Sequence, residues 1–191
     1  MSNLNFYRIR DLEPDEELHY PKGEGAYLSG EGAAAQALRD RIGYAEERDA
    51  GSDPDHRFAV IALGMPVAYY EIRRVIGPEG LRPCYAYLEG SGRELTGGVE
   101  FSCYLLDQRR IGSGLATLLT GLVLPDLANR FGVRWLLGEI HRKNSTSQAF
   151  VRRLGLRPIG RGPAPGWEAH IGGIQEILEA VAQTRLPQTA S

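Results

Sequence analysis

The strongest constraint on the fold is the segment 133–141, VRWLLGEIH, which is apolar at most positions and has no regular polar repeat. Such a run predicts a β-strand that is buried on both faces, inside a sheet that is covered on both sides. The segment 112–131 has apolar residues at helical spacing, and 97–106 is dense in β-branched and aromatic residues, which favour strands. The order strand, helix, buried strand predicts an α/β fold.

The rest of the chain extends this pattern into a sheet of mixed direction. Residues 5–12 alternate apolar and polar side chains and predict an opening strand, while 57–63 and 66–75 flank a Gly-Met turn and predict a hairpin. The other expected elements are a loop at 13–32, a helix at 33–48, a short strand at 84–90, a helix at 145–155, short strands at 156–161 and 167–171, and a helix at 173–185. We expect Pro125 to kink or split the helix at 112–131. The expected fold class is therefore α/β, with a central mixed β-sheet and helices on both faces.

Length and composition limit the class of protein. The 191 residues predict a single domain, 1–191, in which 77–98 is a possible insertion. Hydrophobic residues make up 42% of the chain and charged residues 24%, which is typical of a globular protein with an ordered core. The formal net charge of −2 provides no basic field, so we expect no nucleic-acid partner.

The cysteines and the apolar runs exclude further classes. Cys84 and Cys103 are too few for a disulfide framework, and no His/Cys cluster predicts a metal site. The first residues lack the apolar stretch of a signal peptide, and no uncharged apolar run is long enough to span a membrane. We therefore expect a cytoplasmic protein that needs no metal and has no membrane partner.

The segment 103–119, CYLLDQRRIGSGLATLL, joins a strand to a helix through a turn that favours anion binding. Small residues at 112–114 let a ligand approach the backbone, and a first helical turn presents unpaired N–H groups at the positive end of the helix dipole. Arg109 and Arg110 add positive charge. These features predict a phosphate or diphosphate site. An ordinary helix start with turn-forming glycines fits the same residues, whereas the GxGxxG and P-loop patterns are absent from the sequence.

Taken with the residues that follow it, this turn resembles the signature of the GNAT superfamily of N-acyltransferases, [QR]xxGx[GA], in Arg109–Gly114. In that family a helix, a buried strand, an asparagine and a helix ending in a Gly-Phe pair come next. The same order continues here through the predicted helix and strand to Asn144 and then to Gly155-Leu156. The resemblance covers roughly residues 97–160, which form the expected cofactor-binding core.

The resemblance implies a sheet whose two middle strands, 97–106 and 133–141, splay apart to admit acetyl-CoA as co-substrate. The amides of the turn would hold the diphosphate, and the pantetheine arm would pair with the first strand. Asn144 would bond the pantetheine or the backbone that holds it; a loop asparagine that makes a turn is the alternative. The expected cofactor-binding residues are Cys103, Tyr104, Leu105, Arg109, Arg110, Ile111, Gly112, Ser113, Gly114, Leu115, Ala116 and Asn144.

Two carboxylates are candidates for the base that acyl transfer to an amine requires. Glu139 lies in the buried strand, where many members of the family carry a carboxylate in a similar position. A structural ion pair with Arg134 or Arg142 is the alternative for Glu139. Glu100 lies on the partner strand, on a face that points either to the acceptor or to solvent.

The position that supplies the acid for the leaving thiolate in many members of the family holds a different residue in this chain. Many GNAT enzymes place a tyrosine four residues before the last glycine, where this chain has Val151, which has no proton to donate. Tyr104 or Ser147 would substitute, and we prefer Tyr104 as a third catalytic candidate because a phenol can reach across a cleft. His141 ends the Glu139 strand and is either a proton relay or a surface residue.

The acceptor side is less constrained by the sequence. The segment 77–98 either lies over the cleft or forms a surface hairpin; its polar and aromatic residues include Tyr85, Tyr87, Glu89 and Glu94. Trp167, Glu168 and His170 are candidates for another wall of the site, although core packing is the favoured interpretation of Trp167. Carboxylates near a cleft suit a cationic amine, so we expect a small-molecule amine as acceptor.

Three other functions fit the sequence. The chain could be a coenzyme A-binding module with little or no transferase activity, an interpretation that Val151 favours. It could be a protein acetyltransferase that acts on lysine or N-terminal amines. A nucleotide-binding α/β protein would instead bind ATP or NAD more tightly than coenzyme A. A homodimer could form through an edge strand or the C-terminal helix.

Overall fold

The computed structural model describes residues 7–12, 55–92, 94–106 and 110–184. The predicted loop at 13–32 and the predicted helix at 33–48 lie outside these residues. The description below concerns the described ranges alone.

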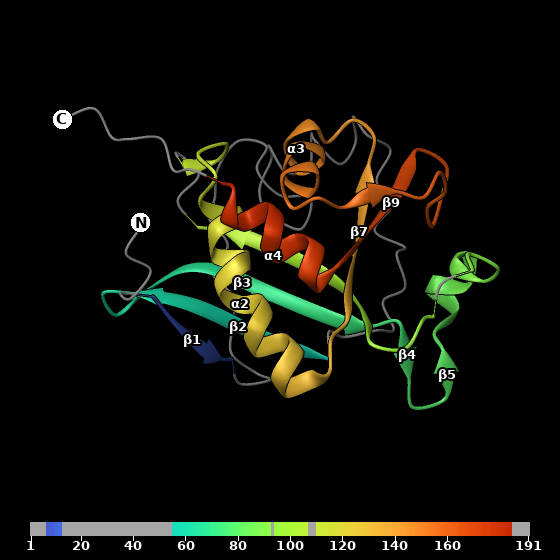
Figure 1. The fold of residues 1–191 in the computed structure, drawn as a ribbon, viewed down its shortest axis with the longest axis horizontal. Coiled ribbons are helices and arrows are strands. Elements are labelled where there is room, and N and C mark those ends of the chain that lie inside the picture. Colours follow the sequence, from blue (N-terminus) through green and yellow to red (C-terminus); the bar gives the residue numbers. More distant parts are fainter. Residues whose placement is uncertain (1–6, 13–54, 93, 107–109, 185–191) are drawn as a thin grey trace, which may run out of the picture.

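A seven-stranded sheet forms the centre of the molecule, with the strand order β1-β2-β3-β6-β7-β9-β8 (Figure 1). The strands are β1 (Tyr7–Asp11), β2 (His56–Ala62), β3 (Met65–Arg74), β6 (Gly98–Leu105), β7 (Trp135–His141), β8 (Arg157–Pro158) and β9 (Trp167–Gly173). Only the β6–β7 pair is parallel, and the other neighbouring pairs are antiparallel. The predicted mixed sheet, the β2–β3 hairpin and the buried strand at 133–141 are thereby confirmed.

Each face of the sheet has its own core. On the helical face, Leu136 and Ile140 of β7 share a cluster with α2 (Leu115–Phe131), α3 (Ser145–Arg153) and α4 (Ile174–Ala182). On the η2 face, Trp135 and Leu137 share a cluster with the 3₁₀-helix η2 (Pro83–Leu88). The alternation of side chains along β7 places the two clusters on opposite sides, so the sheet is covered on both faces.

The segment 77–98 is built differently from its prediction. It begins with a small hairpin, β4 (Ile76–Gly77) and β5 (Gly80–Leu81), and then forms η2 where we predicted a strand at 84–90. That prediction was wrong because Pro83 fits the first turn of a helix, and because residues three apart in a 3₁₀-helix share one side. Tyr85 and Leu88 use this spacing, and each is only 1% exposed.

Helix α2 continues through Pro125, which we expected to kink or split it. The helix is not split. Val123 and Leu124 before the proline and Leu127 after it are all buried in the cluster of the helical face. This shared packing holds the two halves of α2 together although Pro125 donates no backbone hydrogen bond.

The middle of the sheet opens between β6 and β7. Their pairing covers three rungs, from Gly98 opposite Trp135 to Glu100 opposite Leu137, although β6 continues to Leu105 and β7 to His141. Beyond the last rung β6 stays paired with β3, and β7 stays paired with β9. Figure 1 shows β7 and β9 crossing the direction of β2 and β3. The predicted splaying of the middle strands is confirmed.

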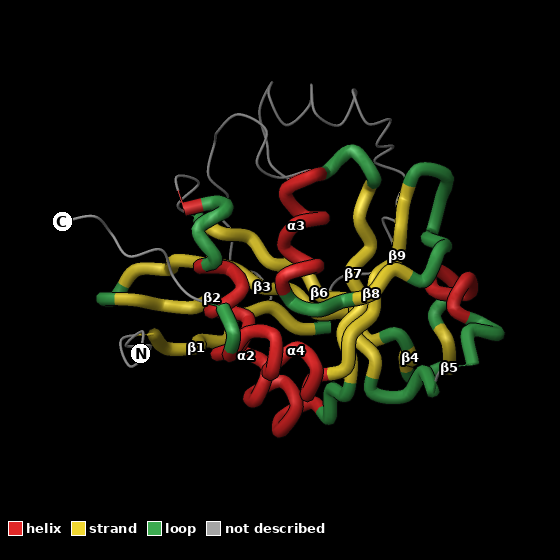
Figure 2. Tube along the Cα trace, turned by 45° about the horizontal axis from the view of Figure 1, so that its top comes forward, coloured by secondary structure: helices red, strands yellow, loops and turns green. Residues whose placement is uncertain are grey.

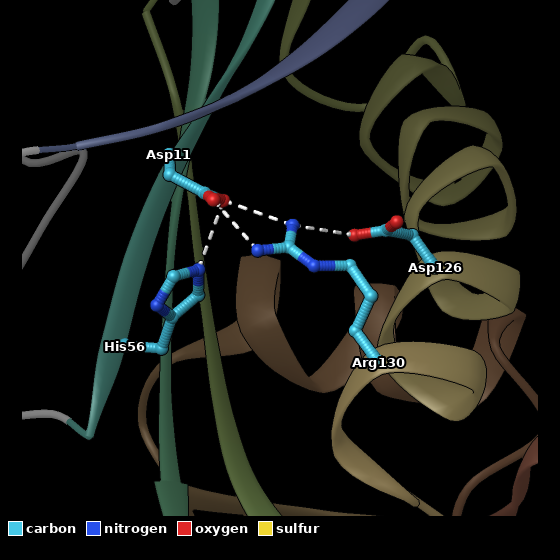
Figure 3. Close-up of polar contacts among 4 residues, drawn as sticks. All are labelled: Asp11, His56, Asp126 and Arg130. Carbon is cyan, nitrogen blue, oxygen red and sulfur yellow. Dashed lines mark hydrogen bonds and ion pairs between the residues drawn. The ribbon is translucent and has the colours of Figure 1, made fainter.

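A charged network fastens the edge strand β1 to the end of α2 (Figure 3). Arg130 donates to Asp11 at 2.6 Å and to Asp126 at 3.1 Å, and His56 of β2 lies 3.0 Å from Asp11. The hydrogen bond from Arg130 lowers the pKa of Asp11, with a further contribution from His56. The contact joins segments that are 119 positions apart in the chain.

The close contact between α2 and α4 at Gly121 and Val181 can be tested by mutation. A Cβ atom on Gly121 would lie 2.4 Å from Cγ1 of Val181. We expect Gly121→Ala to lower the free energy of unfolding by about 1–3 kcal/mol through overpacking, although alanine favours a helix by about 1 kcal/mol. In a Val181→Ala background the same change should be neutral or stabilising. Urea unfolding of the four proteins measures this, and an equal loss in both backgrounds would contradict the packing.

The Asp11 network generates a test of pH dependence. The pKa of Asp11 is lowered on folding from its ordinary value of 3.8, so its stabilisation is complete above that value and is lost as the pH falls through the folded-state pKa. Because Asp11 and Arg130 are partly exposed, we expect Asp11→Asn to lower the free energy of unfolding by only about 0.5–1 kcal/mol at pH 7. The difference between the two proteins should shrink toward pH 3 in urea unfolding; a difference independent of pH would exclude this account.

Candidate functional site

The turn before α2 takes the backbone path that its glycines permit. Gly112 and Gly114 have φ angles of +84° and +87°, in the left-handed region, and Gly114 is the N-cap of the helix. The Ser113 hydroxyl donates to the Arg110 carbonyl at 2.6 Å and accepts from the Leu115 amide at 3.3 Å. The turn is therefore stabilised from within by one serine side chain.

Several amides of this helix tip remain available to a ligand. Within the residues that the structure describes, the N–H groups of Gly112, Gly114, Ala116 and Thr117 donate to no acceptor. They lie at the positive end of the α2 dipole, where an anion is stabilised. The site that the sequence predicts for a phosphate thus has its donors in place.

A cleft of about 350 Å³ lies beside this helix tip, between β6, α2 and α3. Figure 2 shows α3 standing over the region where β6 and β7 part. The predicted cofactor-binding residues that line the cleft are Cys103, Leu105, Arg110, Ile111, Gly112, Gly114 and Ala116. Ser113 and Leu115 contact each other inside the turn instead. Arg109 and the side chain of Tyr104 lie outside the described residues.

The other wall of the cleft is α3, from which the sequence analysis named Ser147 alone. Ser145, Thr146, Ser147, Ala149, Phe150 and Arg153 line the cleft from this side. Positions 146, 149, 150 and 153 follow the helical spacing of three and four residues, so this face could have been found from the sequence. Arg153 donates to the Gly112 carbonyl at 3.0 Å, which places a guanidinium directly beside the turn.

Asn144 has a structural role in this arrangement. Its side-chain oxygen accepts from the Ser147 amide at 3.1 Å and caps α3. The contact corresponds to the turn-forming alternative of the sequence analysis. Asn144 does not line the cleft, but it fixes the first turn of the helix that does.

The two candidate bases both lie on the η2 face, in different surroundings. Glu100 is 8% exposed and accepts from Arg73 at 2.7 Å and from the phenol of Tyr85 at 2.6 Å. Burial and the Glu100 charge raise the pKa of Tyr85, so this phenol stays protonated and donates. These contacts are those of a buried structural carboxylate.

Glu139 lies two residues beyond the last β6–β7 rung, at the beginning of the opening. It is half-buried, and Oε1 accepts a hydrogen bond from the phenol of Tyr87. The alternative of the sequence analysis, an ion pair with Arg134 or Arg142, is not among the contacts of the described residues, and Arg134 pairs with Glu94. Of the two carboxylates, Glu139 is the one beside the opening in the sheet.

The other residues considered for proton transfer, His141, Val151 and Ser147, lie in different surroundings. His141 is 6% exposed, its Nδ1 accepts from the Lys143 amide at 3.2 Å, and burial lowers its pKa, so the ring is neutral at pH 7. His141 is therefore buried rather than on the surface. Val151 is buried against the backbone of Gly138, where it fills the core. Ser147 lines the cleft.

The cysteine in the cleft is poorly suited to nucleophilic catalysis. Burial raises the pKa of Cys103 to about 12, so the side chain is a thiol at neutral pH. A covalent acyl-enzyme at this position is therefore disfavoured.

The described residues also lack two other kinds of feature. They contain no group of three or more His, Cys, Asp or Glu side chains placed to hold a metal ion. No helix among them is long and apolar enough to cross a membrane.

Solved structures share this architecture. Aminoglycoside acetyltransferase AAC(6')-Ib in complex with coenzyme A aligns with 65% of this chain and 69% of its own, with a TM-score of 0.50 and 16% identity. The chain has the GNAT fold. The same enzyme with ribostamycin and coenzyme A covers 68% of each chain, with a TM-score of 0.50 and 17% identity.

A wider match with the same fold has no assigned activity. An uncharacterized protein from Bacillus halodurans covers 78% of this chain and 70% of its own, with a TM-score of 0.53 and 12% identity. No family model and no curated protein matches the chain. The GNAT fold of this protein is thus recognised through its structure at low sequence identity.

Proposed function

We propose that this protein is an acyl-CoA-dependent N-acyltransferase that moves an acetyl group from acetyl-CoA to a primary amine of a small molecule. One observation carries the proposal: the α2 tip, with its available amides, borders a cleft that lies beside the opening between β6 and β7. The cleft residues Cys103 and Leu105 belong to the part of β6 that has left β7. A ligand with a diphosphate at one end and a long polar arm fits this shape.

The two parts of acetyl-CoA, its diphosphate and its pantetheine arm, would bind in two different regions of the protein. The diphosphate of coenzyme A would rest on the amides of Gly112, Gly114, Ala116 and Thr117, with Arg110 and Arg153 supplying positive charge. The pantetheine arm would run along the stretch of β6 from Phe101 to Leu105, which has β3 on one side and no strand of the described sheet on the other. Bound in this way, the thioester would point through the opening toward the η2 face.

The chemistry requires one proton to leave the amine. The amine nitrogen forms a bond to the thioester carbonyl carbon, the carbon–sulfur bond breaks, and the thiolate departs with the electron pair. Glu139 would take the proton from the amine, because it lies where the opening begins and is less buried than Glu100. Val151 offers no proton to the thiolate, and Ser147 in the cleft or Tyr104 would serve instead.

A small-molecule amine is the proposed acceptor. The carboxylate of Glu139 lies beside the opening on the η2 face, which would favour a cationic substrate there, whereas the charge of Glu100 is balanced by Arg73. AAC(6')-Ib, which shares the fold, has been solved with ribostamycin, a small molecule. The alternative of a coenzyme A-binding module without transfer is favoured by one observation, the buried aliphatic side chain of Val151.

Coenzyme A binding can be tested through two neighbouring arginines of α3. Arg153 lines the cleft, whereas Arg152 does not. The Arg152 side chain donates instead to the Gln148 carbonyl of the same helix. We expect Arg153→Ala to raise the Kd for coenzyme A about tenfold, or about 1.4 kcal/mol, by removing a charge beside the diphosphate. Arg152→Ala is the matched control and should leave the Kd within a factor of two. Isothermal titration calorimetry measures both, and equal effects would contradict the proposed orientation.

The base can be identified from the two glutamates. Acetyl transfer is followed through free thiol release on a panel of amines that includes ribostamycin, spermidine, glucosamine, free lysine and a peptide with an unblocked N-terminus. We expect Glu139→Gln to lower kcat by about a hundredfold or more, because a general base contributes this much.

Glu100→Gln serves as the comparison in the same assay. It should mainly lower the free energy of unfolding, by about 1–3 kcal/mol, because Arg73 loses its ionised partner. Undiminished kcat in Glu139→Gln would remove this residue from the mechanism. Tight coenzyme A binding without turnover of any amine would favour the binding module, and turnover of the peptide alone would favour a protein acetyltransferase.

A further inference from the structure

The η2 helix carries two tyrosines whose hydroxyls reach the two strands that part. Tyr85 donates to Glu100 on β6, and Tyr87, two residues later, donates to Glu139 on β7. Glu100 belongs to the last rung of the β6–β7 pairing, and Glu139 lies just beyond it. One short helix therefore bridges the two strands at the point where they diverge.

Contacts at both ends and in the middle hold η2 in place. At its start, Arg82 donates from its amide to the Val75 carbonyl at 3.1 Å and from its side chain to Asp55 at 2.5 Å. At its end, Arg161 donates to the Glu89 carbonyl at 3.4 Å. Between them, the side chains of Tyr85 and Leu88 are buried against β7 and β9. The phenol of Tyr87 is thus presented from a well-packed segment.

We propose that Tyr87 is a positioning residue, which holds the carboxylate of Glu139 at the opening between β6 and β7 in the orientation needed to receive the proton of the acceptor amine. This inference rests on the proposed function. A glutamate side chain has three rotatable bonds, and a hydrogen bond to one carboxylate oxygen selects a small part of its conformations. The segment 77–98 is then part of the catalytic apparatus, whereas the sequence alone also allowed a surface hairpin.

A kinetic double-mutant cycle tests this proposal. Tyr87→Phe removes one hydroxyl and keeps the ring, Glu139→Gln removes the base, and the double variant combines them. The substrates are acetyl-CoA and the amine of the panel above with the highest turnover. We expect Tyr87→Phe to lower kcat about tenfold with the KM for acetyl-CoA within a factor of two, since the cleft proposed to bind acetyl-CoA is on the other face of the sheet.

The decisive comparison is made in the Glu139→Gln background. There the change of Tyr87 to Phe should alter kcat by less than a factor of two, because the carboxylate that it positions is gone. Tyr85→Phe is the matched control, since it removes the sister hydroxyl from the same helix. Any loss of kcat in Tyr85→Phe should be the same in both backgrounds, because its hydroxyl bonds Glu100.

The outcomes separate this inference from the proposed function. A tenfold loss in Tyr87→Phe that persists undiminished in the Glu139→Gln background would overturn the positioning role, and so would an unchanged kcat in Tyr87→Phe while Glu139→Gln is impaired. A wild-type protein that acetylates no amine, or a Glu139→Gln variant with full activity, would overturn the proposed function itself and with it this inference. Thermal unfolding of each variant confirms that the proteins compared are folded.

Discussion

The loss of pairing between β6 and β7 is the constraint on which the rest of the molecule depends. Three rungs hold these parallel strands together, and each strand then follows its other neighbour, β3 or β9. The sheet survives this division because both halves are antiparallel and each strand keeps one full ladder. The ring of Trp135 lies against Gly98, where a Cβ would be 2.0 Å from it, so the first rung has no room for a larger residue.

The two faces of the sheet beside the opening differ in chemistry. The helical face offers backbone amides at the α2 tip and the guanidinium groups of Arg110 and Arg153, which suit an anion. The η2 face offers Glu139, held by Tyr87, which suits a cationic amine. An anionic acyl carrier and a basic acceptor would thus approach the same opening from opposite sides of the sheet. This separation is the physical basis of the proposed transfer.

The sequence predicts the elements that are defined by local pattern. The apolar run at 133–141 and the glycine turn at 112–114 can be identified from the sequence, because burial requires apolar residues and positive φ angles favour glycine. The splaying was expected from the family resemblance, since no local pattern reports where two strands stop pairing. The mistaken strand at 84–90 shows the limit, because alternating apolar residues also satisfy a short 3₁₀-helix. The Tyr87–Glu139 contact joins residues 52 positions apart, and only the fold brings them together.

The central claim is that coenzyme A is held jointly by the α2 tip and by the part of β6 that lies beyond its pairing with β7. Titration of the ¹⁵N-labelled protein with coenzyme A, followed by amide NMR, tests this most directly. The account predicts saturable shifts of the amides of Gly112, Gly114 and Ala116, together with those of Phe101 to Leu105, and little change in the distant strand β1. Saturable binding that leaves the Gly112 and Gly114 amides unshifted would contradict it.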